Sequence, residues 1–100
     1  MLYAVLVRTL REGATYDDFR RSWLPDQPYG SPIRVVTARR VENPREVITI
    51  GAVDLPAARL GEALAAVADQ EAQRHEAIDH VVESTQLHGF YEAIAEDDLS

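Results

Sequence analysis

Four short segments of the chain have the hydrophobic pattern of β-strands. Each is apolar over most of its length, is rich in β-branched or aromatic residues, and is too short for a stable helix. The predicted strands cover residues 1–8, 33–41, 47–53 and 86–94. The middle two are joined by Glu42, Asn43, Pro44 and Arg45, a turn-forming sequence that favours antiparallel pairing, so they are predicted to form a hairpin.

A first helix is predicted between the first two strands. Tyr16, Phe19 and Trp23 stand at i, i+3 and i+7, which places them on one stripe of a helix. Thr15 precedes this stripe and Asp18 follows it by three residues, so the two side chains are predicted to form a capping box. A proline two residues after Trp23 then ends the helix.

A second helical segment covers residues 56–84, where Ala, Glu, Arg and Leu dominate. Apolar residues recur there near helical spacing, although Glu71 and Arg74 interrupt the stripe, and we expect one long helix or two helices end to end. The element order β-α-β-β-α-β predicts a ferredoxin-like α+β fold, a four-stranded antiparallel sheet with two helices on one face. Residues 1–95 are predicted to form this single domain, and residues 96–100 an acidic tail that frays.

Both faces of the predicted sheet are apolar. In the first strand one alternating set is Leu2, Ala4 and Leu6, and the other is Tyr3, Val5 and Val7. The third strand repeats this pattern, but two helices can cover only one face of a sheet. We therefore expect the second face to be buried against a second copy of the chain, in a C2 homodimer packed sheet to sheet.

Composition and charge exclude several function classes. The chain has 100 residues and no cysteine, which excludes disulfides, thiol redox chemistry and thiolate metal sites. Its net charge of −7 argues against nucleic acid as a partner. Residues 1–50 carry eight Arg and six acids (net +2), whereas residues 51–100 carry two Arg and eleven acids (net −9), so an anionic ligand is expected near the first half. Neither a membrane span nor a signal-peptide pattern is found, and a cytoplasmic protein is expected.

Element order, chain length, two-faced strands and the lack of cysteine together resemble the dimeric α+β barrel superfamily, over essentially the whole chain. The segments 19–26 (FRRSWLPD), 43–46 (NPRE) and 87–92 (LHGFYE) are most similar to its uncharacterised members. The resemblance implies a homodimer. It also implies the activities found in the superfamily, which include cofactor-independent antibiotic biosynthesis monooxygenases, haem-degrading monooxygenases and muconolactone-type isomerases.

The pattern of the haem-degrading members is not met. They have an Asn near the end of the first strand and a Trp and a His about ten residues apart on the second helix. Here the strand reads Leu6, Val7, Arg8, and Ala65 stands ten residues before His75. One feature of three is present, so the resemblance implies no haem, and no cofactor is expected.

Aromatic side chains near the first helix form one candidate binding site. Trp23 and Tyr29, together with Tyr16 and Phe19, could line a pocket under the proline-rich segment 25–32. The alternative is that the rings on the helix are only its core stripe.

Basic residues and histidines supply the remaining candidates. Arg34 and Arg39 on the second strand could hold an anion, or they could solvate a sheet edge or pair with acids of the partner chain. His88, on the last strand with Gln86, Phe90 and Glu92, could act as a general base, or it could be an ordinary exposed or hydrogen-bonded histidine.

Acidic and histidine residues also recur every four positions in the second helical segment. The ladders are Glu71, His75, Asp79 and Glu76, His80. Zinc ligands are spaced in this way on helices, but a third ligand is lacking, so a solvated helix face is expected rather than a metal site.

Two function hypotheses follow. The first is a cofactor-independent monooxygenase that acts on a phenolic or enolic substrate, in which His88 is the base, Arg34 the catalytic anion stabiliser, and Arg39 a second anion contact. Its pocket walls would be Tyr3, Trp23, Tyr29 and Tyr91. The alternative is a non-catalytic homodimer that binds a small ligand or a protein, on its own or as a subunit of a larger assembly.

Overall fold

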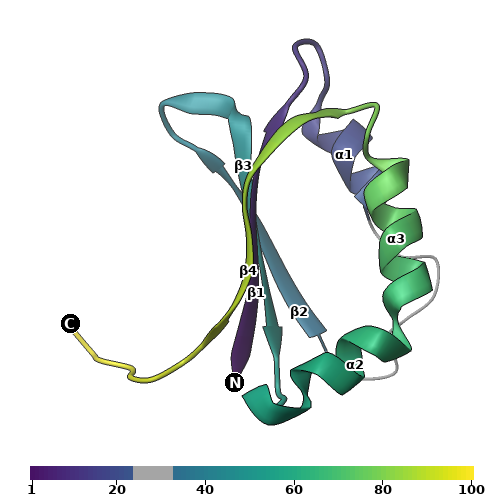
Figure 1. Ribbon diagram of the computed structural model, residues 1–100. Coiled ribbons are helices and arrows are strands. Elements are labelled where there is room, and N and C mark those ends of the chain that lie inside the picture. The colour runs from purple at the N-terminus through teal and green to yellow at the C-terminus, as the bar shows by residue number, and fades with distance from the viewer. Residues whose placement is uncertain (24–32) are drawn as a thin grey trace.

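The computed structural model of the chain describes residues 1–23 and 33–100. These residues form two layers, a β-sheet and a layer of helices that covers one of its faces (Figure 1). The strands are β1 (Leu2–Leu10), β2 (Ile33–Arg40), β3 (Asn43–Val53) and β4 (Val82–Glu92). The helices are α1 (Tyr16–Trp23), α2 (Leu60–Ala66) and α3 (Ala68–Ala77), and the 3-10 turn η1 (Ala57–Arg59) leads into α2.

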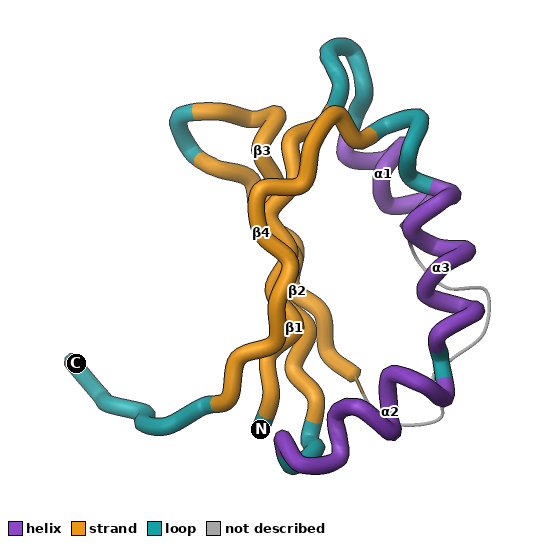
Figure 2. Tube along the Cα trace, viewed as in Figure 1, coloured by secondary structure: helices purple, strands orange, loops and turns teal. Residues whose placement is uncertain are grey.

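The strands form one antiparallel sheet in the order β2-β3-β1-β4, which is compatible with a ferredoxin-like topology. The predicted α+β class and four-stranded antiparallel sheet are confirmed. The element order is βαββααβ, because the second helical segment contains two helices end to end (Figure 2). They are separated at Val67, whose φ of −117° and ψ of 12° lie outside the helical region.

Two boundaries predicted around β1 and β4 are wrong, and for the same reason. β1 continues two residues past Arg8, and β4 begins at Val82, inside the segment that was predicted to be helical. Val82 pairs with Leu10, so the longer β1 supplies a pairing partner for residues that precede the predicted start at Gln86. Pairing across the sheet therefore overrides the local helical preference of this segment.

The hairpin between β2 and β3 is confirmed, but its turn is shorter than predicted. Asn43 already belongs to β3 and pairs with Arg40, which leaves Val41 and Glu42 as the turn. The Arg40 side chain forms ion pairs with Glu42 at 3.1 Å and Glu46 at 3.4 Å, and these exposed contacts hold the hairpin end together.

The first helix begins as predicted. The Thr15 backbone N–H donates to Asp18 Oδ2 at 3.0 Å, and the Asp18 backbone N–H donates to Thr15 Oγ1 at 3.2 Å. This reciprocal pair is a capping box. From there α1 carries Phe19 and Trp23 into the core, whereas Tyr16 stays at the surface with 37% of its area exposed.

The core lies where α1 and α3 pack against the sheet. It contains Leu6, Leu10, Phe19, Trp23, Val47, Ile78 and Val81. Residues of alternate parity on each strand point to this side, which we call the inner face, and the remaining residues form the outer face.

A β-bulge in β4 changes the face of the sheet to which Gln86 belongs. It leaves Gln86 between Thr85 and Leu87 without a pairing partner among the described residues. The Gln86 amide donates a hydrogen bond to the Thr9 hydroxyl, which belongs to the outer face. Gln86 therefore does not share a face with His88, contrary to the strict alternation predicted from the sequence.

The outer face is apolar and no described helix covers it (Figure 1). The strand register assigns to it Tyr3, Val5, Val7, Arg34, Val36, Ala38, Ile48, Ile50, Ala52, Leu87 and Tyr91. Val36 is 63% exposed and Tyr91 is 49% exposed. The predicted two-faced sheet is thus present. None of the helices in the described part of the chain is long and apolar enough to cross a membrane.

Candidate functional site

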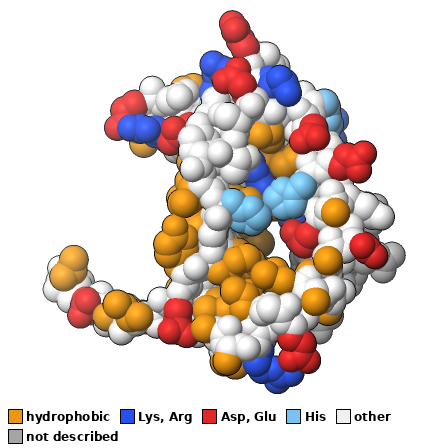
Figure 3. All heavy atoms as spheres, viewed as in Figure 1, with side chains coloured by type: hydrophobic (Ala, Val, Ile, Leu, Met, Phe, Trp, Pro, Cys, Tyr) orange, Lys and Arg blue, Asp and Glu red, His pale blue; other side chains and the backbone are white. Residues whose placement is uncertain are grey.

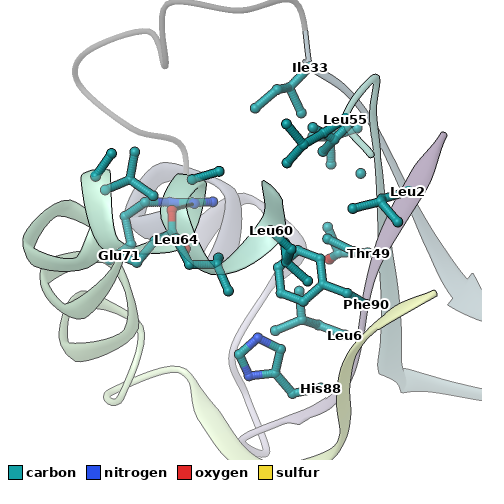
Figure 4. Close-up of a pocket in the computed structure, with 18 of the residues that line it drawn as sticks. Leu2, Leu6, Ile33, Thr49, Leu55, Leu60, Leu64, Glu71, His88 and Phe90 are labelled. Atoms are coloured by element: carbon teal, nitrogen blue, oxygen red, sulfur yellow. Dashed lines mark hydrogen bonds and ion pairs between the residues drawn. The ribbon is translucent and has the colours of Figure 1, made fainter. Parts of the chain in front are cut away.

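A chamber of about 640 Å³ lies between the inner face of the sheet and helices α2 and α3. Its walls are mainly aliphatic and aromatic (Figure 4), including Leu2, Leu6, Ile33, Leu55, Leu60 and Phe90. This volume falls within the range of about 300–1,000 Å³ that is typical of small-molecule sites.

The chamber exists because α2 and α3 do not pack closely on the sheet. Neither helix has a fully buried residue. The apolar residues of α2 that should face the sheet, Leu60, Ala63 and Leu64, line the chamber instead. The break at Val67 changes the direction of the chain between the two helices, so that α2 lies at the end of the helix layer away from α1 (Figure 1).

The core side of the chamber carries several polar and charged groups around one tryptophan. We call this region the polar end, and it comprises Trp23, Thr49, Glu71, Arg74, His75 and His88, which line the chamber, and Arg8, which contacts Trp23 but is not among the lining residues. They come from β1, α1, β3, α3 and β4. The polar end is therefore assembled only when both layers are in place.

Two guanidinium groups lie over the Trp23 ring. The Cζ atom of Arg8 is 4.0 Å from the ring centroid, and that of Arg74 is 3.8 Å away. Both distances are typical of cation–π contacts. The Arg74 Nε also donates to the Trp23 carbonyl oxygen at 2.8 Å, and its Nη1 donates to Glu71 Oε1 at 2.6 Å. Arg74 is thus fixed in place by the end of α1 and by its own helix.

The guanidinium group of Arg8 has fewer hydrogen-bond partners than that of Arg74. It is only 1% exposed, and neither of its terminal nitrogens has a hydrogen-bond partner among the described residues. Burial and the neighbouring Arg74 charge lower its pKa to about 10, and Glu71 acts in the opposite direction. At pH 7 the side chain therefore remains cationic, although most of its hydration has been removed.

His75 and His88 connect the two layers at the side of the chamber. Their ring centroids are 5.4 Å apart and the rings are stacked, while the rings of His75 and Trp23 form a T-shaped pair with centroids 5.2 Å apart. Figure 3 displays neighbouring histidines that bridge the sheet and the helix layer beside a hydrophobic hollow. Burial, Arg8 and His88 lower the pKa of His75 below its ordinary value, against the opposing effect of Glu71. His75 is therefore neutral at pH 7 and able to accept a proton.

Thr49 is the polar residue in the middle of the sheet wall. It is 4% exposed, lines the chamber (Figure 4), and its hydroxyl has no hydrogen-bond partner within the described part of the chain. The register places it in one row with Leu6 and His88. A hydroxyl in this position can donate to or accept from a bound molecule.

Only part of the site predicted from the sequence is assembled here. His88 and Trp23 line the chamber. Tyr29 lies outside the described residues. Arg39 is exposed on β2 and is not among the chamber-lining residues described by the structure.

The remaining three candidates lie on the opposite side of the sheet. Arg34, Tyr3 and Tyr91 form one register row on the outer face, connected through Ala52. The structure thus separates Arg34 from His88 by the thickness of the sheet, since side chains of opposite parity point to opposite faces.

Three residues of the polar end, Arg8, Thr49 and Arg74, were not among the candidates from the sequence, whereas Glu71 and His75 appeared there only in the ladder that was interpreted as a solvated helix face. The sequence did contain a signal for Arg8. Side chains alternate between the two faces of a strand, so Arg8 is expected on the same face as Leu2, Ala4 and Leu6, which is the inner face. Glu71 and Arg74 were visible as interruptions of an apolar helical stripe. The contact of Arg74 with Trp23 depends on the packing of α3 against α1 and has no counterpart in sequence spacing.

Within the described residues, no group of three or more His, Asp and Glu side chains is placed to hold a metal ion. The closest contact in the predicted ladders is between His75 Nε2 and Glu71 Oε2, which are 4.0 Å apart. Glu71 also accepts the hydrogen bond from Arg74. The arrangement is that of an electrostatic network around Trp23.

Comparison with known proteins identifies no relative. No protein-family model matches the chain, and neither the curated proteins nor the solved structures contain a significant match. The structure defines an α+β protein with a four-stranded antiparallel sheet and an internal chamber. Membership of the dimeric α+β barrel superfamily stays a prediction.

Proposed function

We propose that this protein binds a small, largely apolar molecule that carries one polar group. The observation that supports this most directly is the chamber of about 640 Å³, whose walls are aliphatic and whose charged residues gather mainly around Trp23. An apolar ligand gains roughly 25 cal/mol for each Å² that it removes from water. A few polar groups on one side then fix its orientation.

Filling the chamber tests this proposal. In Ala63→Phe a bulky ring is introduced into the chamber from α2, whereas Ala65→Phe places the same ring on the same helix at an exposed position that does not line the chamber. We expect the neutral dye Nile red to bind the wild type and Ala65→Phe, and to bind Ala63→Phe at least about tenfold more weakly, which corresponds to about 1.4 kcal/mol. Equal binding by all three proteins would place the dye elsewhere.

Catalysis is a second candidate function, and the neutral state of His75 favours it. In the proposed reaction His75 or His88 takes the proton from a phenolic or enolic substrate, and Arg74 stabilises the resulting anion. The anion then reacts with dioxygen to give a hydroperoxide, which loses water and leaves a new carbonyl group. One O₂ is consumed and one water is released for each CH₂ oxidised to C=O, so no cofactor is required.

Oxygen uptake in the presence of an anthrone tests the catalytic proposal. We expect turnover by the wild type and by Arg34→Met, whose substitution is on the outer face. Turnover by His75→Gln should fall by about 10²-fold or more, which is the usual contribution of a general base. Uptake equal to the protein-free rate would leave ligand binding as the sole function, in agreement with the non-catalytic alternative.

We further propose that the outer face is covered by a second copy of the chain, so that the ligand-binding unit is a homodimer. The hairpin end between β2 and β3 and the C-terminal residues 93–100 both project on the side of this face (Figure 1). They carry Val41, Ile94 and Leu99, each more than 90% exposed. Together with the apolar strand residues they form a concave surface that a second sheet would fill.

Native mass spectrometry tests the dimer and detects retained ligand in the same measurement. We expect a dimer for the wild type and a monomer for Val36→Asp, which places a charge on the outer face. Val35→Asp changes the neighbouring residue, on the other face of the same strand, and should remain dimeric. A monomeric wild type at micromolar concentration would contradict the proposal.

A further inference from the structure

Building on the proposed homodimer, we infer that the C-terminal segment of each copy, residues 93–100, crosses to the other copy and pairs its carboxylates with Arg34 there. The inference states how the two copies are oriented and which side chains join them. It rests on three features: the charge of Arg34 on an apolar face, the exposed side chains of the C-terminal segment, and the symmetry that brings the two together.

Arg34 carries an isolated charge on the face that the proposed dimer covers. In the three register rows of the outer face that pass through Tyr3, Val5 and Val7, it is the only charged residue that the structure describes. It forms no ion pair with any other described residue. A guanidinium keeps its proton in proteins, so a second sheet over this face must bring an acid or leave a desolvated charge without a partner.

The C-terminal segment leaves the sheet on the side of the outer face (Figure 2). Its last backbone hydrogen bond to the sheet, within the described chain, runs from the Ala93 N–H to the Met1 carbonyl oxygen at 3.1 Å. Every residue after it is exposed, and Ile94 is 94% exposed. Glu96 and Asp97 form no ion pair with the described residues. The segment thus presents apolar and acidic side chains that its own copy does not use.

The segment is long enough to cross to a second sheet. Sheets packed face to face lie about 10 Å apart, and the four residues from Ala93 to Asp97 extend over about 13 Å. Ile94 therefore reaches the outer face of the other copy, and the carboxylates that follow reach one end of its strands. The symmetry of the dimer decides which strand they meet.

Two directions of a C2 axis bring the outer faces together, and charge distinguishes them. An axis perpendicular to the strands puts β2 of each copy opposite β2 of the other, with opposite ends together. Arg34 then faces the hairpin end of the other copy, where Arg39 and Arg40 lie. The acids at that end, Glu42 and Glu46, are already ion-paired with Arg40. Like charges therefore oppose this orientation.

An axis parallel to the strands brings opposite charges together. The sheet order β2-β3-β1-β4 places β2 and β4 at the two edges, so β4 of each copy lies opposite β2 of the other. The ends that meet carry Arg34 and the start of the C-terminal segment, because Arg34 and Tyr91 share a register row. Ile94 then packs beside Val36, which is 63% exposed and is the next outer-face residue after Arg34. The contact is made twice, as C2 symmetry requires.

Charge reversal followed by native mass spectrometry tests the inference. We expect the dimers of Arg34→Glu and of the double variant Glu96→Arg/Asp97→Arg to dissociate at least about tenfold more readily than the wild-type dimer, because each variant puts like charges together twice. Arg20→Glu makes the same charge change on α1, in the helix layer, and should dissociate like the wild type (Figure 1).

Mixing the variants distinguishes a contact between copies from one within a copy. A heterodimer of Arg34→Glu with the C-terminal double variant has opposite charges at both contacts, whereas each homodimer has like charges at both. We expect more heterodimer than the two homodimers together, whereas random exchange of equally stable dimers gives equal amounts. A mixture of Arg20→Glu with the double variant should show no such excess.

Two results would overturn the inference while the proposed dimer stands. The first is an unchanged dimer affinity in both Arg34→Glu and the double variant. The second is weakened homodimers without an excess of heterodimer, which would place the contact within one copy. A monomeric wild type would contradict the proposed dimer itself, and the inference with it.

Discussion

Arg8 combines two properties that are seldom found together in a small domain, a nearly complete loss of exposed surface and terminal nitrogens without hydrogen-bond partners among the described residues. Side chains that reduce stability without an evident structural gain are expected mainly at functional sites. The neighbouring residues agree with this interpretation, because Trp23 lies between the core and the chamber and contacts both Arg8 and Arg74.

Substitution of Arg8 by methionine should not reduce the stability of the ligand-free protein. Met retains a long apolar side chain against Trp23 and removes a buried charge, so the free energy of unfolding is expected to be unchanged or raised, by up to about 4 kcal/mol. Urea unfolding followed by circular dichroism measures it. A decrease of more than about 2 kcal/mol would mean that Arg8 mainly stabilises the fold.

Stability should decrease in mild acid because of His75. Its folded-state pKa lies below the value of about 6.5 expected for the unfolded chain, since burial and the Arg8 and His88 charges disfavour the imidazolium. The unfolded state therefore binds more protons, and stability is complete above about pH 6.5 and falls as the pH decreases through the folded-state pKa.

The His75 contribution can be isolated by unfolding at a series of pH values. His75→Gln should show a smaller loss of stability between pH 7.5 and pH 5 than the wild type does. His80→Gln is the control, because His80 is exposed. If the two variants had the same pH profile as the wild type, the burial of His75 would have no energetic consequence.

At the scale of the elements, capping and pairing decide where each helix and strand begins. The capping box of Thr15 and Asp18 starts α1 at Tyr16, and this position fixes the direction in which Phe19 and Trp23 enter the core. Hydrogen bonds from Thr15 and Arg21 to Asp18 also hold the pKa of its carboxyl below the ordinary value. The start of α1 was therefore predictable from local sequence, because all of its determinants lie within a few residues.

Loss of the Thr15 hydroxyl should destabilise the protein by about 1 kcal/mol, the usual cost of removing a helix cap. We expect this for Thr15→Ala in urea unfolding, and we expect Thr15→Ser, which keeps the hydroxyl, to unfold close to the wild-type midpoint. If the serine variant were as unstable as the alanine variant, the effect would come from the loss of the threonine methyl group and not from the cap.

The ends of β1 and β4 were not predictable in the same way. Residues 82–85 have no stronger strand signal than the helical segment before them, and they become a strand because Leu10 and the residues before it supply pairing partners. The turn between β2 and β3 was shortened for a similar reason, since Asn43 finds a partner in Arg40. Strand ends depend on a partner that is distant in sequence, and local pattern carries little information about it.

At the scale of the whole molecule, the sheet has an inner face that encloses the chamber and an outer face that no described helix covers (Figure 1). The two faces give the protein separate surfaces for ligand binding and for the proposed self-association. Because Tyr3, Arg34 and Tyr91 belong to the outer face, their substitution should affect assembly before it affects the chamber.

Stability should depend on protein concentration if the outer face is the dimer interface. Association stabilises the folded state by mass action, so the thermal midpoint of the wild type is expected to rise as the protein is concentrated. The midpoint of Val36→Asp should be lower and independent of concentration. A wild-type midpoint that stays constant from about 1 to 100 μM would contradict a dissociable dimer.

Local sequence pattern accounts for the α+β class, the four strands, the hairpin, the capping box of the first helix and the two apolar faces of the sheet. These features follow from the spacing of apolar residues and from caps and turns, which act over a few residues. The residues that meet at the chamber depend on how the helices and strands pack together. It placed Arg8 and Arg74 over the Trp23 ring, stacked His75 on His88, and moved Arg34 to the opposite face from His88. Those contacts join elements that are far apart in the chain, and their geometry arises only when α3 packs across α1 and the sheet.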